Sequence, residues 1–227
     1  MKSHIYFLFT VLMSLLFSCG GGEEHLKYYE TGELEMRKPI QDGMANGLVT
    51  YYYKSGQIKL ECNYTNDKKN GLCKTYRESG VIQMEVFYKN DSAYGVKKEY
   101  YDDGSLQFEI TLDNGTRNGP AKEYYANTKL KAHYFFNNNK IDSVYTEYYE
   151  NGGIKSKVVY NMGTLHGSSL EYYENGVNKS AATYVNGLLN GMALTFYDNG
   201  NTKEEIEYKN GMLVSKRAFD KNGTILK

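Results

Sequence analysis

Tryptophan is absent from this chain of 227 residues, and net charge is absent too, because 27 Lys and Arg balance 27 Asp and Glu. A DNA- or RNA-binding protein normally carries a basic excess that displaces counterions from phosphates, so neutrality argues against a nucleic-acid partner. Histidine is scarce: only His25, His133 and His166 follow the N-terminal apolar run, and they are far apart in sequence. This spacing favours neither a metal cluster nor a nucleophile paired with a base. We therefore expect no enzyme, no metal and no cofactor.

Long hydrophobic runs are limited to one, IYFLFTVLMSLLF at residues 5–17. It is short for a membrane-spanning helix, which needs roughly 20 residues. Lys2 precedes the run and Ser18-Cys19 follows it, a pattern typical of a secretory signal peptide. Leu16-Phe17-Ser18-Cys19 resembles the lipobox of bacterial lipoproteins, although Phe17 departs from the small residue usual there. The resemblance implies lipid attachment at Cys19; the alternative is an ordinary signal with a chance cysteine.

Tyrosine and glycine are abundant, with Tyr 24 and Gly 23 in the composition, which favours short strands separated by tight turns. EYYENG occurs at residues 147–152 and again at 171–176, and the whole chain repeats with this 24-residue period from Gly22. Position 7 of each repeat is aromatic, position 8 is tyrosine in seven of eight repeats, and position 11 is glycine in seven. Asn-Gly often opens a repeat, and His166 occupies that position once, which predicts a turn there.

Each repeat contains two predicted strands joined by a turn such as Tyr149-Glu150-Asn151-Gly152, in which glycine takes a left-handed conformation. Residues such as Leu106, Phe108 and Ile110 alternate with polar residues and predict one apolar face. The register places position 7 opposite position 13, on that apolar face, and position 6 opposite position 14. It predicts three cross-strand ion pairs: Glu123 with Lys131, Glu147 with Lys155, and Glu171 with Lys179. The fold class is therefore all-β, with tandem antiparallel β-hairpins forming one long twisted sheet, which we expect to curl over its apolar face.

The pattern YYxxGxL followed by YxNG resembles the MORN repeat, in the variant found in bacterial YwqK-type proteins. The resemblance covers nearly all of the chain after Cys19 and implies tandem hairpins laid side by side. We divide the chain into a lipoprotein signal peptide at 1–19, a short linker at 20–22, and an array at 23–227 of eight full repeats plus a truncated ninth. Thr128 and Ser143 replace glycines, and Asn178 and Thr202 replace apolar residues, so we expect weaker packing toward the C-terminal end.

Cys62 and Cys73 would encounter an oxidising compartment if the chain is exported. Cys62 is at an odd position on the apolar face and Cys73 at an even position on the polar face, whereas directly opposed residues share a face. We therefore expect no disulfide, unless a bulge in the loop TNDKKNG changes the register.

The expected function is that of a non-catalytic, lipid-anchored repeat scaffold that binds another protein, since repeat sheets offer long surfaces and no pocket. The YwqK resemblance implies a narrower role as an antitoxin or immunity-like protein. The alternatives are a carbohydrate-binding repeat protein of the cell envelope, which usually depends on tryptophan, and a structural spacer. We expect the location to be the cell envelope, on the outer membrane. The candidate partner-binding ribbon consists of the exposed position-8 tyrosines Tyr29, Tyr53, Tyr101, Tyr125, Tyr149, Tyr173 and Tyr197.

Overall fold

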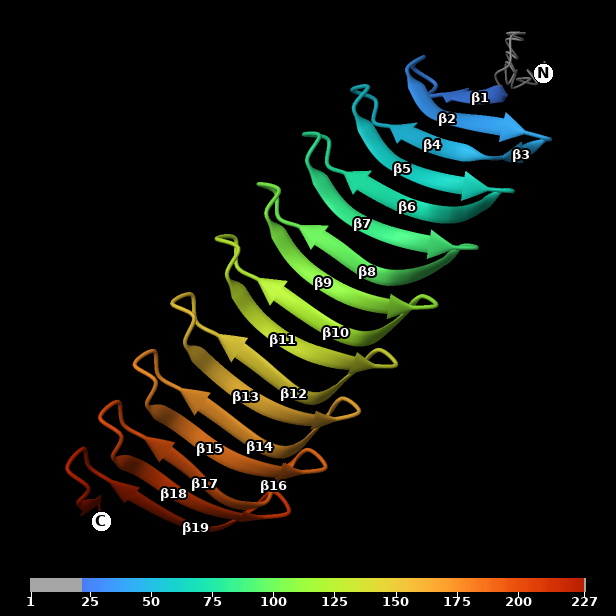
Figure 1. Ribbon diagram of the computed structural model, residues 1–227. Helices are drawn as coiled ribbons and strands as arrows, with labels where there is room; N and C mark the ends of the chain where they lie inside the picture. The colour runs from blue at the N-terminus through green and yellow to red at the C-terminus, as the bar shows by residue number, and fades with distance from the viewer. Residues whose placement is uncertain (1–21, 227) are drawn as a thin grey trace, which may run out of the picture. The chain divides into compact units, whose positions relative to one another are not determined.

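The computed structural model describes residues 22–226, so the signal peptide, Cys19 and most of the linker lie outside the described residues. The described residues form 20 antiparallel strands and no helix. Figure 1 shows long curved strands joined by tight turns. The predicted all-β fold of tandem hairpins with repeats of about 24 residues is confirmed. No helix within residues 22–226 is long and apolar enough to cross a membrane.

The strands fall into two series that alternate along the chain. The first strand of each hairpin ends at position 7 of the repeat: β1 (Glu23–Tyr28), β4 (Gly47–Tyr52) with its short extension β3 (Met44–Ala45), β6 (Lys68–Tyr76), β8 (Ser92–Tyr100), β10 (Thr116–Tyr124), β12 (Lys140–Tyr148), β14 (Thr164–Tyr172), and β17 (Gly191–Phe196) with its extension β16 (Leu188–Leu189). The second strand begins at position 13: β2 (Leu34–Gln41), β5 (Ile58–Thr65), β7 (Ile82–Lys89), β9 (Leu106–Asp113), β11 (Leu130–Asn137), β13 (Ile154–Asn161), β15 (Asn178–Val185) and β18 (Thr202–Lys209). The last repeat contributes β19 (Met212–Phe219) and β20 (Ile225–Leu226).

The chain divides into two compact units. The first contains the described residues up to Val81 together with residues 88–91, and the second contains residues 82–87 and the described residues from Ser92 onward. In the second unit, the strand pairings from β8 to β20 join neighbours along the chain, and none of the described pairings returns to β8. These pairings leave the sheet of this unit open, and the curling over its apolar face stays a prediction. Phe108 and Ile110 remain half-buried.

Two kinds of turn connect the strands. At positions 8–11 the Tyr149 amide donates to the Gly153 carbonyl at 2.8 Å and the Gly152 amide donates to the Tyr149 carbonyl at 2.9 Å. Gly152 has φ +87°, so this turn is the one predicted, with a left-handed glycine. The second turn is at positions 21–22, where both residues have positive φ, such as Asn138 at 48° and Asn139 at 67°. This is a type I′ turn, whose twist matches that of the strands it joins.

The Asn-Gly pair that opens many repeats forms no turn, contrary to the prediction. Asn70-Gly71 lies within β6 and His166 within β14. Cys62 pairs with Cys73 and Tyr64 with Lys69, so three residues of β6, 70–72, bulge opposite Asn63. Gly71 has φ +118°, and a Cβ there would come within 3.1 Å of the Asn63 Cβ. Glycine therefore suits this bulge, because it adopts positive φ without strain and has no Cβ to meet Asn63.

A second bulge, at position 14, changes which residues share a face. Tyr124 pairs with Leu130, as the predicted register of positions 7 and 13 requires, but Glu123 pairs with Ala132. The one-residue shift puts positions 13 and 15 on opposite faces. Position 7 therefore lies on the face opposite to the core, and its assignment to the apolar face was wrong.

The core face is formed by positions 4, 6, 15, 17, 19 and 24. In the first unit Met36, Ala45 and Val49 are buried together, with Tyr51 and Tyr64 packed against them. In the second unit Ala121 and Ala132 are almost completely buried. The Tyr134 ring stacks on Tyr145, and the Arg117 guanidinium lies 4.4 Å from the Phe136 ring centroid. No described side chain after Ser156 is fully buried, which confirms the expected weaker packing toward the C-terminal end.

Candidate functional site

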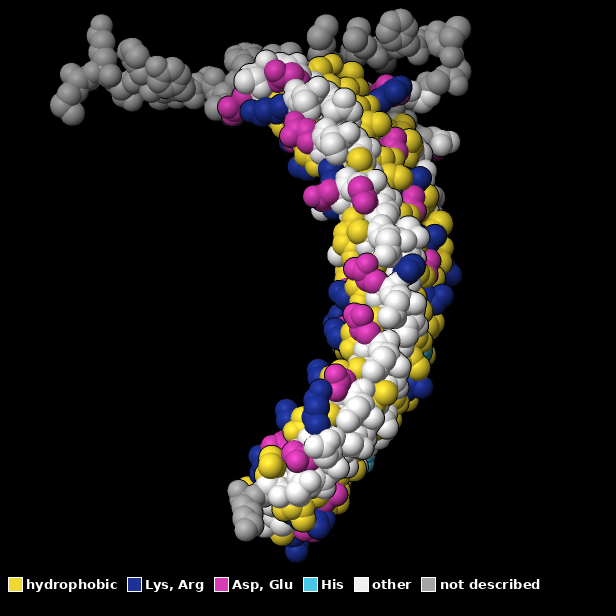
Figure 2. Space-filling model, turned by 90° about the vertical axis from the view of Figure 1, so that its left-hand side faces the viewer, with side chains coloured by type: hydrophobic (Ala, Val, Ile, Leu, Met, Phe, Trp, Pro, Cys, Tyr) yellow, Lys and Arg dark blue, Asp and Glu magenta, His cyan; other side chains and the backbone are white. Residues whose placement is uncertain are grey.

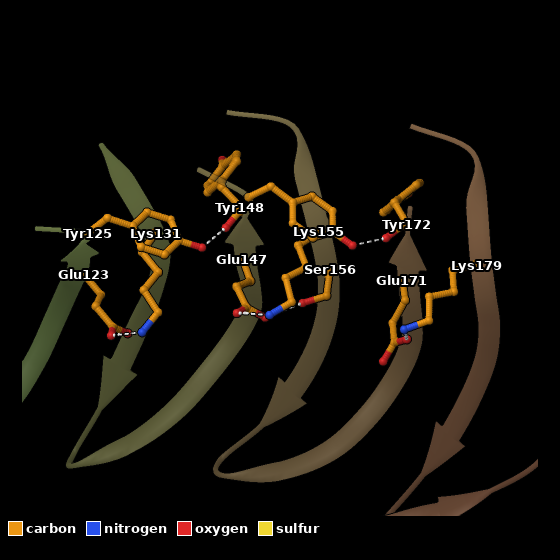
Figure 3. Close-up of polar contacts among 11 residues, drawn as sticks. Glu123, Tyr125, Lys131, Glu147, Tyr148, Lys155, Ser156, Glu171, Tyr172 and Lys179 are labelled. Carbon is orange, nitrogen blue, oxygen red and sulfur yellow. Dashed lines mark hydrogen bonds and ion pairs between the residues drawn. The ribbon is translucent and has the colours of Figure 1, made fainter. Parts of the chain in front are cut away.

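The position-8 tyrosines form a hydrogen-bonded ladder between repeats. The hydroxyl of each donates to the backbone carbonyl of the residue that ends the first strand of the next repeat, at 2.6 to 2.9 Å. The acceptors are Tyr52 for Tyr29, Tyr76 for Tyr53, Tyr124 for Tyr101, Tyr148 for Tyr125, Tyr172 for Tyr149, Phe196 for Tyr173 and Phe219 for Tyr197. Figure 3 shows the bond from Tyr125 to Tyr148.

These seven tyrosines are half-buried rather than exposed, so the predicted exposed ribbon is wrong in that respect. Their hydroxyls are bonded to the backbone of the next repeat. Cations lie near some of the rings: Lys131 Nζ is 5.8 Å from the Tyr125 centroid and Lys54 Nζ is 5.6 Å from that of Tyr29. Such contacts are favourable because the ring face is electronegative. Partial burial raises the pKa of Tyr125. Half-buried rings beside lysines can still contribute to an interface.

The three predicted cross-strand ion pairs are present beside this ladder, as Figure 3 shows. The distances are 2.7 Å for Glu123–Lys131, 2.8 Å for Glu147–Lys155 and 3.4 Å for Glu171–Lys179. The hydrogen bond to each glutamate raises the pKa of Lys131 and Lys155. In the first repeat the signs are exchanged, with Lys27 bonded to Glu35 at 2.9 Å. Positions 6 and 14 therefore accommodate a pair of opposite charges in either order.

A further set of hydrogen bonds, between positions 7 and 16, was not predicted. The Tyr100 hydroxyl donates to Glu85 at 2.8 Å and the Tyr124 hydroxyl to Glu109 at 2.9 Å. Burial, followed by the bonded carboxylate, raises the pKa of Tyr100 and Tyr124 to about 12. Glutamate at position 16 in three successive repeats was a signal in the sequence, but the register between neighbouring hairpins, in which Glu109 pairs with Lys122, is needed to place it beside the tyrosine.

The histidines remain separate. His133 Nδ1 lies 3.1 Å from the Tyr148 hydroxyl, and His166 Nδ1 lies 3.2 Å from Asn186 Oδ1. Across residues 22–226, His, Cys, Asp and Glu side chains form no group that could hold a metal ion. The hydrogen-bond partners described for these two histidines are a tyrosine hydroxyl and an asparagine side chain.

Cys62 and Cys73 are joined by a disulfide, contrary to the prediction. They are directly opposed on β5 and β6, and both are buried. The parity argument failed because the two-residue turn at Asn66-Asp67 places odd positions of β5 opposite even positions of β6, so Cys73 shares the core face with Cys62. The bulge at residues 70–72 then brings Cys73 directly opposite Cys62.

A family model for the MORN repeat variant matches six segments: residues 45–66, 69–90, 93–114, 141–162, 165–186 and 189–210. Together they cover more than half of the chain. The chain belongs to the MORN repeat variant family. Residues 117–138 are unmatched, yet β10 and β11 form the same hairpin there, with Thr128 in the place of glycine. No curated protein is significantly similar to the chain.

Proposed function

We propose that this MORN repeat protein is a non-catalytic scaffold that binds a partner protein and is held at a membrane by a lipid on Cys19. The observation that carries the proposal is the ladder of half-buried tyrosines, present in seven of the eight full repeats and flanked by ion pairs in several of them. Tyrosine rings with a polar rim suit protein interfaces, and their hydroxyl bonds to the backbone hold the rings in fixed positions at low entropic cost. Nothing in this arrangement requires bond-making chemistry.

The proposed location is the cell envelope. The Cys62–Cys73 disulfide supports it, because structural disulfides persist in oxidising compartments. Gly20, Gly21 and Gly22 separate Cys19 from β1, and at up to about 3.6 Å per residue they would hold the first repeat near the bilayer. The residue after Cys19 is glycine rather than aspartate, which favours the outer membrane by analogy with other lipoproteins.

An antitoxin or immunity-like role is the narrower form of the same proposal. In that role the partner would be a harmful protein whose surface the repeat array covers. This narrower role is supported by the resemblance of the repeat pattern, YYxxGxL followed by YxNG, to that of YwqK-type proteins.

Crosslinking and affinity capture of the full chain from the envelope of its own bacterium test the proposal. We expect one stoichiometric protein with the wild type. Replacing Tyr125, Tyr149 and Tyr173 by phenylalanine should retain it because the rings remain, whereas replacement by serine should lose it. Retention of the partner by a folded serine variant would refute the tyrosine surface, and capture of cell-wall sugar instead would refute the protein partner. Membrane association that survives Cys19→Ala would refute the lipid anchor.

A further inference from the structure

Four of the large apolar side chains that lie exposed in the second unit are on strands β7 to β12, on the face opposite to the core. They are Phe87 on β7, Val96 on β8, Phe135 on β11 and Val144 on β12, each 42 to 45% exposed. Val86 is buried while Phe87 is exposed, as expected where successive residues point to opposite faces. The Phe87 ring also contacts Tyr94, another exposed aromatic. Thr111 on β9 and Pro120 on β10 lie between the two pairs, so these residues form an apolar row across the strands.

A row of charged residues lies on the same face, two residues away along each strand. Lys98 on β8 pairs with Glu109 on β9, and Glu109 pairs with Lys122 on β10. Lys122 in turn pairs with His133 on β11. Glu109 also accepts the Tyr124 hydroxyl at 2.9 Å. The surface in Figure 2 likewise mixes cations and anions among hydrophobic side chains on the side that is visible.

We propose that a second copy of this chain packs against this face, with a two-fold axis that runs parallel to the strands between β9 and β10. Such an axis exchanges β8 with β11 and β7 with β12. Val96 then faces Phe135 of the second copy, and Phe87 faces Val144 of the second copy, so all four exposed side chains find apolar partners. Glu109 faces Lys122 of the second copy, and symmetry makes that ion pair twice.

The charge order is the reason for choosing a second copy over an unrelated protein. Glu109 and Lys122 are adjacent and opposite in sign, so the face is complementary to itself about the axis between them. An axis one strand away, between β8 and β9, would also pair opposite charges, Lys98 with Glu109. It would, however, place Val96 against Thr111 and would match the exposed residues less well. Exposed apolar rows with a polar rim mark interaction sites in soluble proteins.

The test is the association of charge-reversed variants, with the full chain purified in non-ionic detergent and its mass measured by light scattering and sedimentation. Wild type should be dimeric. E109K alone and K122E alone should each associate about tenfold more weakly, because like charges then meet twice at the axis. A one-to-one mixture of the two variants should recover wild-type association, since each reversed charge then meets an opposite charge on the other chain.

Mixing the E109K and K122E variants distinguishes a charge contact between two copies from one within a single chain. Glu109 and Lys122 are already opposed within each chain, and mixing leaves the internal repulsion of each variant unchanged. Val96→Glu should also abolish association, whereas Met212→Glu, on a residue 69% exposed in β19, should not. Melting temperatures near that of wild type will show that the variants fold.

Three results would overturn the proposal. One is a wild-type monomer at up to about 100 μM, a concentration at which a micromolar Kd would populate the dimer. Another is a mixture of E109K and K122E that associates no better than either variant alone. The third is recovery only when E109K is mixed with K98E, which would place the axis between β8 and β9.

Discussion

Replacing Tyr125, Tyr149 and Tyr173 together by phenylalanine should lower the stability of the array without removing its rings. Each hydroxyl donates to the backbone of the next repeat, at 2.6, 2.7 and 2.8 Å respectively. A hydrogen bond contributes about 1 kcal/mol net, so the triple variant should lose about 3 kcal/mol. For a protein of this size, each kcal/mol shifts Tm by about 2 to 4 °C. We therefore expect a fall of about 6 to 12 °C in a thermal melt followed by circular dichroism.

Amide hydrogen exchange localises the effect. Because the stability of a repeat array depends on contacts between neighbours, the hairpins joined by these three tyrosines should exchange faster while β1 and β2 do not. Tyr28→Phe is the matched control, since Tyr28 is a tyrosine of position 7 with a side chain 52% exposed. Its replacement should leave Tm within about 1 °C of wild type. A triple variant that melts within about 2 °C of wild type would show that the hydroxyls do not hold the repeats together.

Three other predictions concern local features of the chain. Thr128 takes φ +66° where other repeats have glycine. Thr128→Gly should therefore raise the free energy of unfolding by about 1 kcal/mol in a denaturant titration, and Gly152→Thr should lower it. If Thr128→Gly is no more stable than wild type, the backbone of Thr128 is not strained. The disulfide closes a loop between residues separated by 11 positions. Cys62→Ala with Cys73→Ala should therefore cost about 3 kcal/mol, and alkylation without reductant should label neither cysteine in wild type. The pKa of Tyr100 and Tyr124 is raised to about 12 from the ordinary value of 10.0, so the folded state favours their neutral form. Their contribution to stability should be complete below pH 10 and be lost between pH 10 and about 12. Tyr100→Phe with Tyr124→Phe should weaken that dependence. Tyrosinate absorbance in the difference between wild type and this double variant would disprove the shift if it rose at the ordinary pH.

The repeat period, the all-β class and one of the two turns could be predicted from the amino-acid sequence alone. They depend on local chemistry: glycine at position 11 permits a left-handed turn residue, and alternation along Leu106, Phe108 and Ile110 is typical of a strand. The ion pairs of Glu123 and Glu147 were also predictable, because a short turn keeps positions 6 and 14 within reach of each other even though the bulge pairs Glu123 with Ala132.

Tertiary structure decided whatever depended on the bulges and on contacts between successive repeats. The bulge at residues 70–72 brought Cys73 opposite Cys62. The position-14 bulge put the position-7 tyrosines on the face opposite to the core, and the register between neighbouring hairpins placed Tyr124 beside Glu109. A single extra residue reverses the facing of all residues beyond it, and a period-two pattern does not reveal where that residue is inserted. The position-8 hydroxyls likewise found their acceptors on the next hairpin, at a distance set by strand packing rather than by any motif within one repeat.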